Sequence, residues 1–160
     1  MENRNIALNK DLYLTYPEGY HLMTLDECKS INLTAQGEGI AIGDAGLQNI
    51  IVIGWQNTIL GSMMMNADDV ARNMANTLGM GMKGANYQHS DLVQKSFGGV
   101  GGYGFSFAYD AQGVRKMGLS FVVEKGKSFY YFNFYGDSNT QAETARIAEE
   151  VLSSIKWGSV

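Results

Sequence analysis

The stretch of the sequence that most restricts the fold runs from Phe97 to Gly136. It reads FGGVGGYGFSFAYDAQGVRKMGLSFVVEKGKSFYYFNFYG, in which aromatic and β-branched residues alternate with small or polar ones. Glycine-containing turn sequences interrupt it twice, near Gly113 and Gly126. This pattern predicts three consecutive antiparallel strands that are joined by two tight hairpins.

The turn at Gly126 sets the pairing of the second and third strands. A two-residue loop made of Lys125 and Gly126 would place Phe121 opposite Tyr130, with glycine supplying a positive φ. Side chains two positions apart along a strand lie on the same face of the sheet. One face of these two strands is therefore predicted to carry Met117, Leu119, Phe121, Val123, Tyr130, Phe132 and Phe134.

The turn from Asp110 to Gly113 has two interpretations. A three-residue loop with Gly113 as a bulge would pair Asp110 with Val114 and place Phe107 opposite Met117. A four-residue loop would shift the register by one and move the aromatic residues of the first strand to the other face. We favour the bulged loop, because it gathers every large side chain on one face. The second face is then low in relief and carries Gly104, Ser106, Ala108, Gly118 and Ser120, with Phe129 and Tyr131 beside them.

Two helices and several further strands are predicted around these three strands. Val70, Met74 and Leu78 recur at helical spacing within Asn66 to Met82. A second helix is expected from Thr140 to Lys156, with Thr140 and Glu143 as a capping box. Its apolar stripe, rich in small residues, is expected to pack on the low-relief face; it comprises Ala145, Ala148, Val151, Leu152 and Ile155. The other predicted elements are strands at 11–16, 21–23, 40–42, 49–53 and 91–97, and a short helix capped by Thr24 and Glu27.

Length and composition favour one globular domain. The chain has 160 residues, of which 45% are hydrophobic and 18% charged, and its net charge is −4. We expect an N-terminal extension at 1–10 and a single domain at 11–157.

The acidic balance and the lack of a Lys/Arg run disfavour nucleic acid as a partner. The apolar run from Ile40 to Met65 is interrupted by glycine and polar residues, so we expect no transmembrane segment. The N-terminus lacks the apolar core of a signal peptide, which predicts a cytoplasmic protein as the chain stands, or a secreted or lipid-anchored one if a leader was removed.

The motifs that could carry chemistry all lack the context that chemistry requires. Gly99 to Gly104 matches G-x-G-x-x-G, but a strand-like sequence follows it where dinucleotide binding needs a helix. His89-Ser90-Asp91 contains the residue types of a hydrolase triad, but adjacent side chains do not converge as a triad does. Cys28, the one cysteine, is interpreted as a small buried hydrophobe. With two histidines in the chain we expect no metal site and no cofactor.

Two further patterns have more local meanings. Asn32-Leu33-Thr34 is an acceptor pattern for glycosylation, which matters only if the chain is secreted in a host that glycosylates. The methionines at positions 63–65 are interpreted as packing residues before the first helix, with an adaptable contact surface as the alternative.

The order of motifs resembles that of the PsbP-like family. That family includes PsbP of photosystem II, Ran-binding proteins of the Mog type and bacterial domains of unassigned role. The resemblance rests on the segment Leu14-Thr15-Tyr16-Pro17-Glu18-Gly19-Tyr20, the apolar strand from Ile50 to Trp55, the helix after it, the hairpins and the terminal helix that ends in Ser154-Ile155-Lys156-Trp157. It spans about residues 11–157. It implies an α+β fold, an α/β/α sandwich with a central antiparallel sheet, and it implies no catalytic residue.

The function predicted from the sequence is that of a non-enzymatic binding or accessory domain that contacts a protein partner or self-associates. Most alternating aromatic residues are expected in the core, and four are left as candidate partner contacts: Trp55, Tyr109, Tyr131 and Tyr135. The alternative is a small-molecule-binding protein or a hydrolase that uses the glycine-rich corner at residues 98–104.

Overall fold

The computed structural model describes residues 4–9, 11–30, 38–57, 59–60, 63–64, 66–81, 84–126 and 128–158. The acceptor pattern Asn32-Leu33-Thr34 lies outside these residues, and so do Met65 and the side chains of Met63 and Met64.

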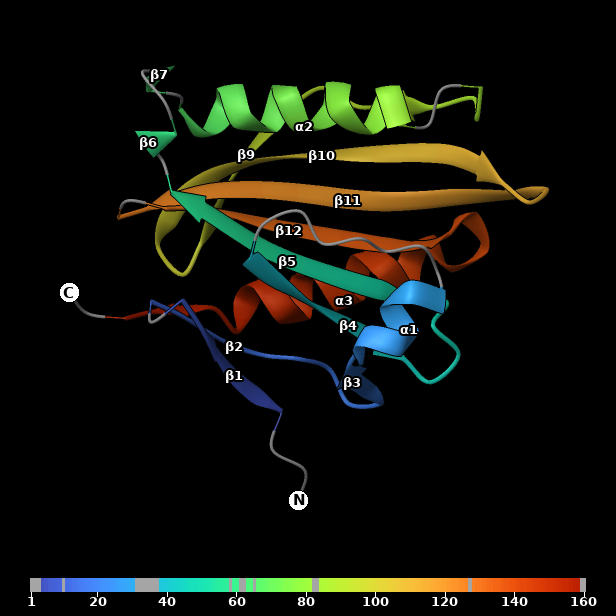
Figure 1. Cartoon of the computed structure of the whole chain (residues 1–160), viewed down its shortest axis with the longest axis horizontal. Helices are drawn as coiled ribbons and strands as arrows, with labels where there is room; N and C mark the ends of the chain where they lie inside the picture. Colours follow the sequence, from blue (N-terminus) through green and yellow to red (C-terminus); the bar gives the residue numbers. More distant parts are fainter. Residues whose placement is uncertain are drawn as a thin grey trace.

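A large antiparallel sheet forms the centre of the molecule (Figure 1). Its strand order is β3 (Tyr20–Leu22), β4 (Glu38–Asp44), β5 (Ile50–Asn57), β12 (Ser128–Asp137), β11 (Val114–Lys125), β10 (Val100–Ala111) and β8 (Gln88–His89), and β9 (Val93–Phe97) also pairs with β10. The three strands predicted from the Phe97–Gly136 stretch, β10 to β12, are its longest elements.

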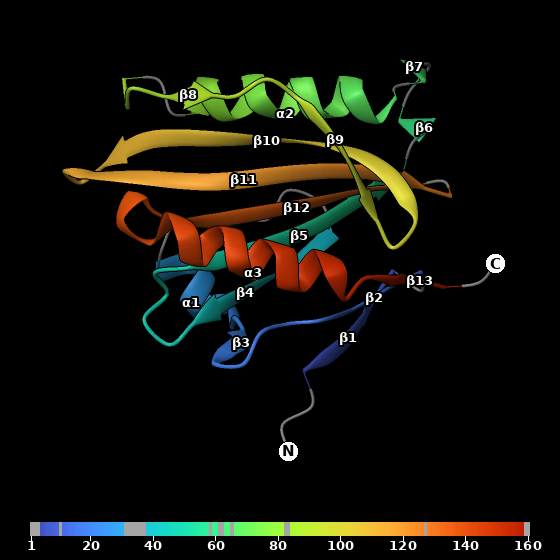
Figure 2. The same cartoon turned by 180° about the vertical axis from the view of Figure 1, so that it is seen from behind.

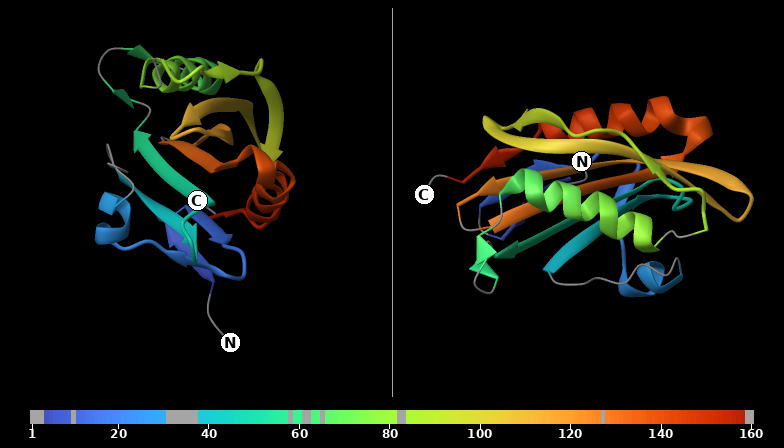
Figure 3. Two further views of the ribbon diagram at one scale, coloured as in Figure 1. Left: turned by 90° about the vertical axis from the view of Figure 1, so that its right-hand side faces the viewer. Right: turned by 90° about the horizontal axis from the view of Figure 1, so that it is seen from above.

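Two helices cover opposite faces of this sheet, as Figure 3 shows from the side. Helix α2 (Ala67–Gly81) lies against β10 and β11, and α3 (Gln141–Ser153) lies against β11 and β12. The short helix α1 (Leu25–Ser30) follows β3. The predicted α/β/α sandwich with a central antiparallel sheet is therefore confirmed.

A second, small sheet joins the first and last described parts of the chain. It consists of β1 (Asn5–Leu8), β2 (Leu12–Thr15) and β13 (Lys156–Trp157), and β2 is the central strand. Figure 2 shows β13 leading from the end of α3 to this sheet. Leu12 and Leu14 point into the core that also receives α3, whereas Tyr13 between them is 45% exposed. The remaining short elements are β6 (Ile59–Leu60), β7 (Met63–Met64) and the 3₁₀ helix η1 (Ser138–Thr140).

The hairpin between β11 and β12 has the predicted faces but a different register. Lys125 pairs with Ser128, so that Phe121 lies opposite Phe132 instead of Tyr130. Gly126 has a φ of +63°, as a two-residue hairpin loop requires. The predicted pairing was wrong by two positions along β12. A shift of two leaves each side chain on its face, so the face assignment was right.

The hairpin between β10 and β11 has a register that differs from the favoured one by a single position. Ala111 pairs with Val114, and Phe107 lies opposite Gly118 instead of Met117. The loop consists of Gln112 and Gly113, whose φ angles of +51° and +78° are those of a two-residue type I′ turn. The bulged three-residue loop was wrong because Gln112 adopts the left-handed conformation that is usually left to Gly, Asn or Asp.

This one-residue shift moves the aromatic side chains of β10 to the face that α2 covers. Phe105 and Phe107 are 2% exposed there and pack with Ala75 of α2. On the opposite face, the position across from Phe121 is Gly104, where a Cβ atom would lie 2.3 Å from the Phe121 ring. Large residues therefore lie opposite small ones, and both faces have a well-filled core.

Helix α3 packs on the aromatic face and not on the low-relief face that we predicted. Its core includes Phe121 and Phe134, and Leu119 packs against the same cluster. The predicted stripe is also partly wrong, because Ala145 is exposed and Ile147 is buried. The buried residues of α3 are Thr144, Ile147, Ala148, Val151 and Leu152.

The two predicted capping boxes have different outcomes. At α1, the Thr24 amide donates to the Glu27 carboxylate at 3.0 Å and the Glu27 amide donates to the Thr24 hydroxyl at 3.1 Å, as predicted. At α3, the Thr140 hydroxyl is directed back to Asp137, and η1 precedes the helix. The predicted box of Thr140 with Glu143 is wrong, because Glu143 forms an ion pair with Arg146.

Candidate functional site

A hollow of about 510 Å³ opens at the end of the large sheet where the β10–β11 hairpin, the end of β12 and the β4–β5 loop meet. We call it the tyrosine hollow. Its volume lies within the range of about 300–1,000 Å³ that is usual for ligand sites. The residues that line it are Ser30, Leu47, Gln48, Ile50, Tyr109, Ala111, Gln112, Lys116, Tyr135 and Gly136.

Two tyrosines form the aromatic part of the hollow, and both are positioned by Phe107. The Tyr109 ring is nearly parallel to the Phe107 ring at a centroid distance of 6.1 Å, and the Tyr135 ring meets it edge to face at 5.6 Å. Because Phe107 is buried under α2, its ring holds both tyrosines in place. Within the described part of the chain, neither phenol hydroxyl hydrogen-bonds to another residue.

Both phenols are protonated at neutral pH, and their pKa values lie above the ordinary tyrosine value of about 10. The pKa of Tyr135 is raised to about 12, first by burial and then by the neighbouring Tyr109 and Tyr87. The pKa of Tyr109 is also raised, first by burial and then by the carboxylate of Asp137. The hollow therefore presents two neutral hydroxyl groups that can donate or accept a hydrogen bond.

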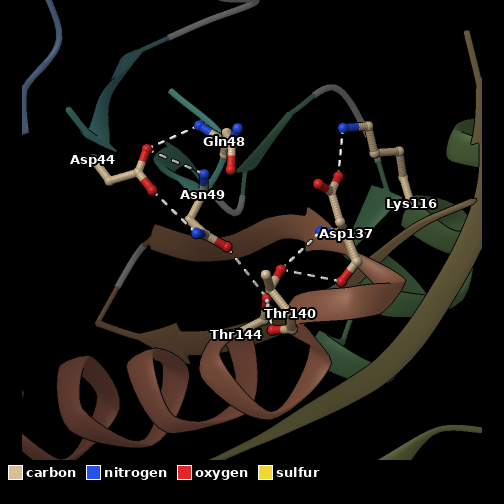
Figure 4. A network of polar contacts seen from close by, with 7 residues as sticks. All are labelled: Asp44, Gln48, Asn49, Lys116, Asp137, Thr140 and Thr144. Carbon is tan, nitrogen blue, oxygen red and sulfur yellow. Dashed lines mark hydrogen bonds and ion pairs between the residues drawn. The ribbon is translucent and has the colours of Figure 1, made fainter. Parts of the chain in front are cut away.

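A polar network holds one wall of the hollow, the β4–β5 loop (Figure 4). The Asp44 carboxylate accepts hydrogen bonds from the backbone amides of Gln48 at 2.8 Å and Asn49 at 3.3 Å, and from the Asn49 side chain at 3.1 Å. Three hydrogen bonds to one carboxylate fix the conformation of the loop, so the backbone that carries the Gln48 side chain is ordered. Figure 4 shows the Gln48 carboxamide outside this network.

The same network connects the loop to the start of α3 and to the opposite wall. The Thr144 hydroxyl lies 3.5 Å from Asn49 Oδ1 and 3.2 Å from the Thr140 carbonyl, so its single proton has two acceptors. The Asp137 amide donates to the Thr140 hydroxyl at 3.2 Å, and the Asp137 carboxylate accepts from Lys116 Nζ. The two walls are thus held by a continuous set of side chains (Figure 4).

Gly136 allows the walls to approach each other this closely. A Cβ atom at this position would lie 2.3 Å from Thr144 Oγ1 and 2.8 Å from Asn49 Oδ1. Any other residue would push the network apart.

The hollow has no net charge of its own. Lys116 is the only charged residue that lines it among the described residues, and its ammonium group is paired with Asp137. The remaining polar groups are the two phenols, the carboxamides of Gln48 and Gln112, and the hydroxyl of Ser30. This set offers hydrogen-bond donors and acceptors without a free charge.

The four candidate contact residues do not form one surface. Tyr109 and Tyr135 line the hollow. Tyr131 lies on the same sheet face but packs against the start of α2, where burial raises its pKa to about 12. Trp55 is on the opposite face and packs against the core that α3 covers. The sequence analysis missed Gln48 and Lys116. A type I′ turn at Gln112 and Gly113 would have placed Tyr109 on the same side of the sheet as these two residues, and recognising that turn type could have identified them.

The glycine-rich corner is a hairpin turn. Gly98 and Gly99 have φ angles of +57° and +87° and form the two-residue loop between β9 and β10. A strand follows the motif, so the helix N-terminus that dinucleotide binding needs is not at this place. Trp157 Nε1 donates to the Phe97 carbonyl at 2.7 Å beside the turn. A shallow hollow of about 470 Å³ lies near Gly101 and Gly102. The alternative of a small-molecule-binding protein or hydrolase that uses this corner therefore stays a prediction.

The other candidate motifs are built into local structure. His89 Nδ1 lies 2.8 Å from the Ser90 carbonyl, and the Ser90 hydroxyl donates to the Asp91 carbonyl at 3.0 Å. Their side chains therefore do not form a relay. His21 is paired with Glu27 at 2.9 Å.

Across the described ranges, no cluster of three or more His, Cys, Asp or Glu residues could hold a metal ion. Within the same ranges, no helix is long and apolar enough to cross a membrane.

The fold occurs in several proteins of known structure. Cyanobacterial PsbP (CyanoP) from Synechocystis sp. PCC 6803 is similar over 92% of this chain and 86% of its own, with a TM-score of 0.67 and 13% identity. LpqN, a protein involved in cell envelope biogenesis of Mycobacterium tuberculosis, matches 92% of this chain and 83% of its own, with a TM-score of 0.66 and 14% identity. A point mutant of Mog1 matches 97% and 95%, with a TM-score of 0.59 and 8% identity.

These similarities confirm the PsbP-like fold that the sequence motifs indicated. No family model matches the sequence, and neither does any curated protein. At such low identity the likeness concerns the fold, and function has to be argued from the site.

Proposed function

We propose that this protein is a non-enzymatic binding domain that contacts a protein partner through the end of the sheet around the tyrosine hollow. We call this surface the tyrosine end and define it by Tyr109, Val114, Tyr135 and the lining of the hollow. The observation that carries the proposal is the presence of two ordered, partly exposed tyrosines around a hollow without net charge.

The composition of the tyrosine end matches the centre of a protein–protein interface. Such centres are enriched in aromatic residues and depleted of charge, and polar groups surround them. Here Tyr109 and Tyr135 are half-buried, Val114 beside the turn is 40% exposed, and the carboxamides of Gln48 and Gln112 lie at the rim. Tyrosine also loses little conformational entropy on binding, because its ring has few rotatable bonds, and Phe107 already orders both rings here.

Rigid walls favour binding as well. The network from Asp44 through Thr144 to Lys116 fixes both sides of the hollow before a partner arrives (Figure 4). A preorganised surface spends less free energy on ordering itself when it binds.

Affinity capture with matched tyrosine variants tests the proposal. The protein is immobilised and exposed to extract of its own cells, and bound proteins are identified by mass spectrometry. Tyr109→Ala removes an aromatic side chain from the tyrosine end, and Tyr13→Ala removes an exposed one from the small sheet as the control. We expect a protein that the wild type and the Tyr13 variant retain and that the Tyr109 variant loses at least about tenfold.

Two results would contradict the proposal. One is a partner that Tyr109→Ala retains, or that Tyr13→Ala loses to the same degree. The other is recovery of a single metabolite and no protein, which would favour a small-molecule-binding protein. A second copy of the chain counts as a partner, and sedimentation at increasing concentration would show it as a rise in mass that the Tyr109 variant lacks.

A further inference from the structure

We infer that the tyrosine hollow receives an uncharged carboxamide side chain, asparagine or glutamine, from the partner protein. The inference rests on the proposed function and adds the chemistry of the group that the partner inserts. It follows from the balance of charge in the hollow, from its hydrogen-bonding groups and from its rigidity.

The balance of charge disfavours an ionic ligand. The Lys116 ammonium group is paired with the Asp137 carboxylate, and the Asp137 amide donates to the Thr140 hydroxyl. A carboxylate entering the hollow would have to compete with Asp137 for Lys116, and an ammonium group would meet no carboxylate among the described residues that line the hollow. Since charged groups lose hydration when they are buried, either would enter without compensation.

The hydrogen-bonding groups of the hollow call for a ligand that both donates and accepts. Tyr109 and Tyr135 are protonated at neutral pH, since burial raises their pKa values further above it, and their hydroxyls have no partner among the described residues. The carboxamides of Gln48 and Gln112 offer a carbonyl and an amino group each. A carboxylate can only accept and an ammonium group can only donate, whereas a carboxamide does both.

The apolar lining fits the methylene part of such a side chain. Leu47 and Ile50 line the hollow together with the edges of the two tyrosine rings. Its volume of about 510 Å³ holds a side chain of this length with room for bridging water. A purely apolar side chain would fit in size but would leave the phenol and carboxamide groups without partners, which costs binding free energy.

The decisive experiment titrates the intact, ¹⁵N-labelled protein with three blocked amino acids of similar length. N-acetyl-glutamine methylamide is the neutral probe, N-acetyl-glutamate methylamide has the same shape with a negative charge, and N-acetyl-methionine methylamide lacks the side-chain carboxamide while all three share the same blocking amides. We expect the glutamine probe to shift the side-chain amide signals of Gln48 and Gln112 and the backbone signal of Gly136. We expect both other probes to bind at least about tenfold more weakly, the factor that corresponds to one well-formed hydrogen bond.

Variants locate the binding to the hollow. Tyr135→Phe removes one hydroxyl and retains the ring, and it should weaken the glutamine probe several-fold. Tyr13→Phe removes an exposed hydroxyl elsewhere and should change nothing. Gln48 lies on an exposed loop, and Gln48→Ala keeps the backbone hydrogen bond to Asp44. This variant therefore tests whether the probe binds in the hollow even if Tyr135→Phe perturbs folding.

The inference is overturned if the glutamate or methionine probe binds as well as the glutamine probe. It is also overturned if the shifts appear at another surface, or if Tyr135→Phe and Gln48→Ala both leave the affinity unchanged. Its failure differs from a failure of the proposed function. A partner that depends on Tyr109 while the probes show no preference for glutamine removes the inference alone. Glutamine binding without a captured protein removes the proposed function, and with it the partner as the source of the carboxamide.

Discussion

Replacement of Gly104 by alanine tests the register of the β10–β11 hairpin, on which the position of the tyrosine hollow depends. In the observed register Gly104 lies opposite Phe121, and an added Cβ would be 2.3 Å from Phe121 Cδ1 and 2.6 Å from Cε1. An ordinary contact between these atoms is 3.5–4.0 Å, so the ring would have to move by more than ~1 Å. In the register one position away, Gly104 would lie opposite Ser120 and an alanine would fit.

The Phe121 ring has little room to move. It is 6% exposed and meets Phe97 edge to face at 5.5 Å and Phe134 edge to face at 6.0 Å. Overpacking of such a core costs about 1–3 kcal/mol. We therefore expect Gly104→Ala to lower the free energy of unfolding by about 2 kcal/mol. If the register were shifted, the same change would raise it slightly, because alanine restricts the unfolded chain more than glycine does.

Urea denaturation of the wild type, three single variants and one double variant measures this effect. Gly101→Ala is the matched control in the same strand, because a Cβ there would meet no atom within 4 Å, and it should change the free energy of unfolding by less than about 0.5 kcal/mol. Phe121→Leu shortens the clashing side chain, so the double variant Gly104→Ala/Phe121→Leu should lose at least about 0.5 kcal/mol less than the sum of the single losses. A stabilising Gly104→Ala, or additive losses, would refute the register and with it the placement of Tyr109.

Three further predictions concern the network and the termini of the fold. The pKa of Tyr135 is raised to about 12, from about 10 in the unfolded chain. The protonated phenol therefore contributes up to about 3 kcal/mol to the free energy of unfolding below pH 10, and this contribution is lost as the pH rises to 12. Tyrosinate absorbance should show this late titration, and Tyr135→Phe should reduce its amplitude by one tyrosine, because burial also raises the pKa of Tyr131 to about 12. Gly136→Ala should destabilise by about 1–3 kcal/mol in urea, and Thr144→Ala should recover part of the loss by removing the hydroxyl that lies 2.3 Å away; no recovery would contradict the clash. Trp157→Phe should lose about 1 kcal/mol with its hydrogen bond to the Phe97 carbonyl, and an unchanged midpoint would show that water replaces the bond.

The two hairpins show which part of the fold the sequence determines. At Gly126 the predicted loop was misplaced by one residue on each strand, which shifts the pairing by two and keeps every side chain on its face. At Gly113 the error was one position, and it reversed the face of Phe105 and Phe107. The three strands of the Phe97–Gly136 stretch and the two covering helices were predictable from periodicity, because this signal does not depend on the loop type. The short strands β1, β8 and β13 were not predicted.

The candidate site was harder to predict, since its residues come together only through tertiary pairing. Tyr109 and Tyr135 were identified as aromatic residues that the core might leave exposed. Gln48 and Lys116 are ordinary surface residues in the sequence and become part of a site because the β4–β5 loop reaches the end of β11 and β12. Trp55 lies on the other face of the sheet from the two tyrosines, because one step along β5 decides whether a side chain faces α3 or the other side.

The small sheet has a consequence for how the protein is made. Leu12 pairs with Trp157, so β2 finds one of its two neighbours only after the chain up to Trp157 has left the ribosome. Closing a loop of this length costs conformational entropy and slows folding. During synthesis the faces of Leu12 and Leu14 that α3 later covers would stay exposed to solvent or to a chaperone. The small sheet can therefore be completed only once β13 has been made.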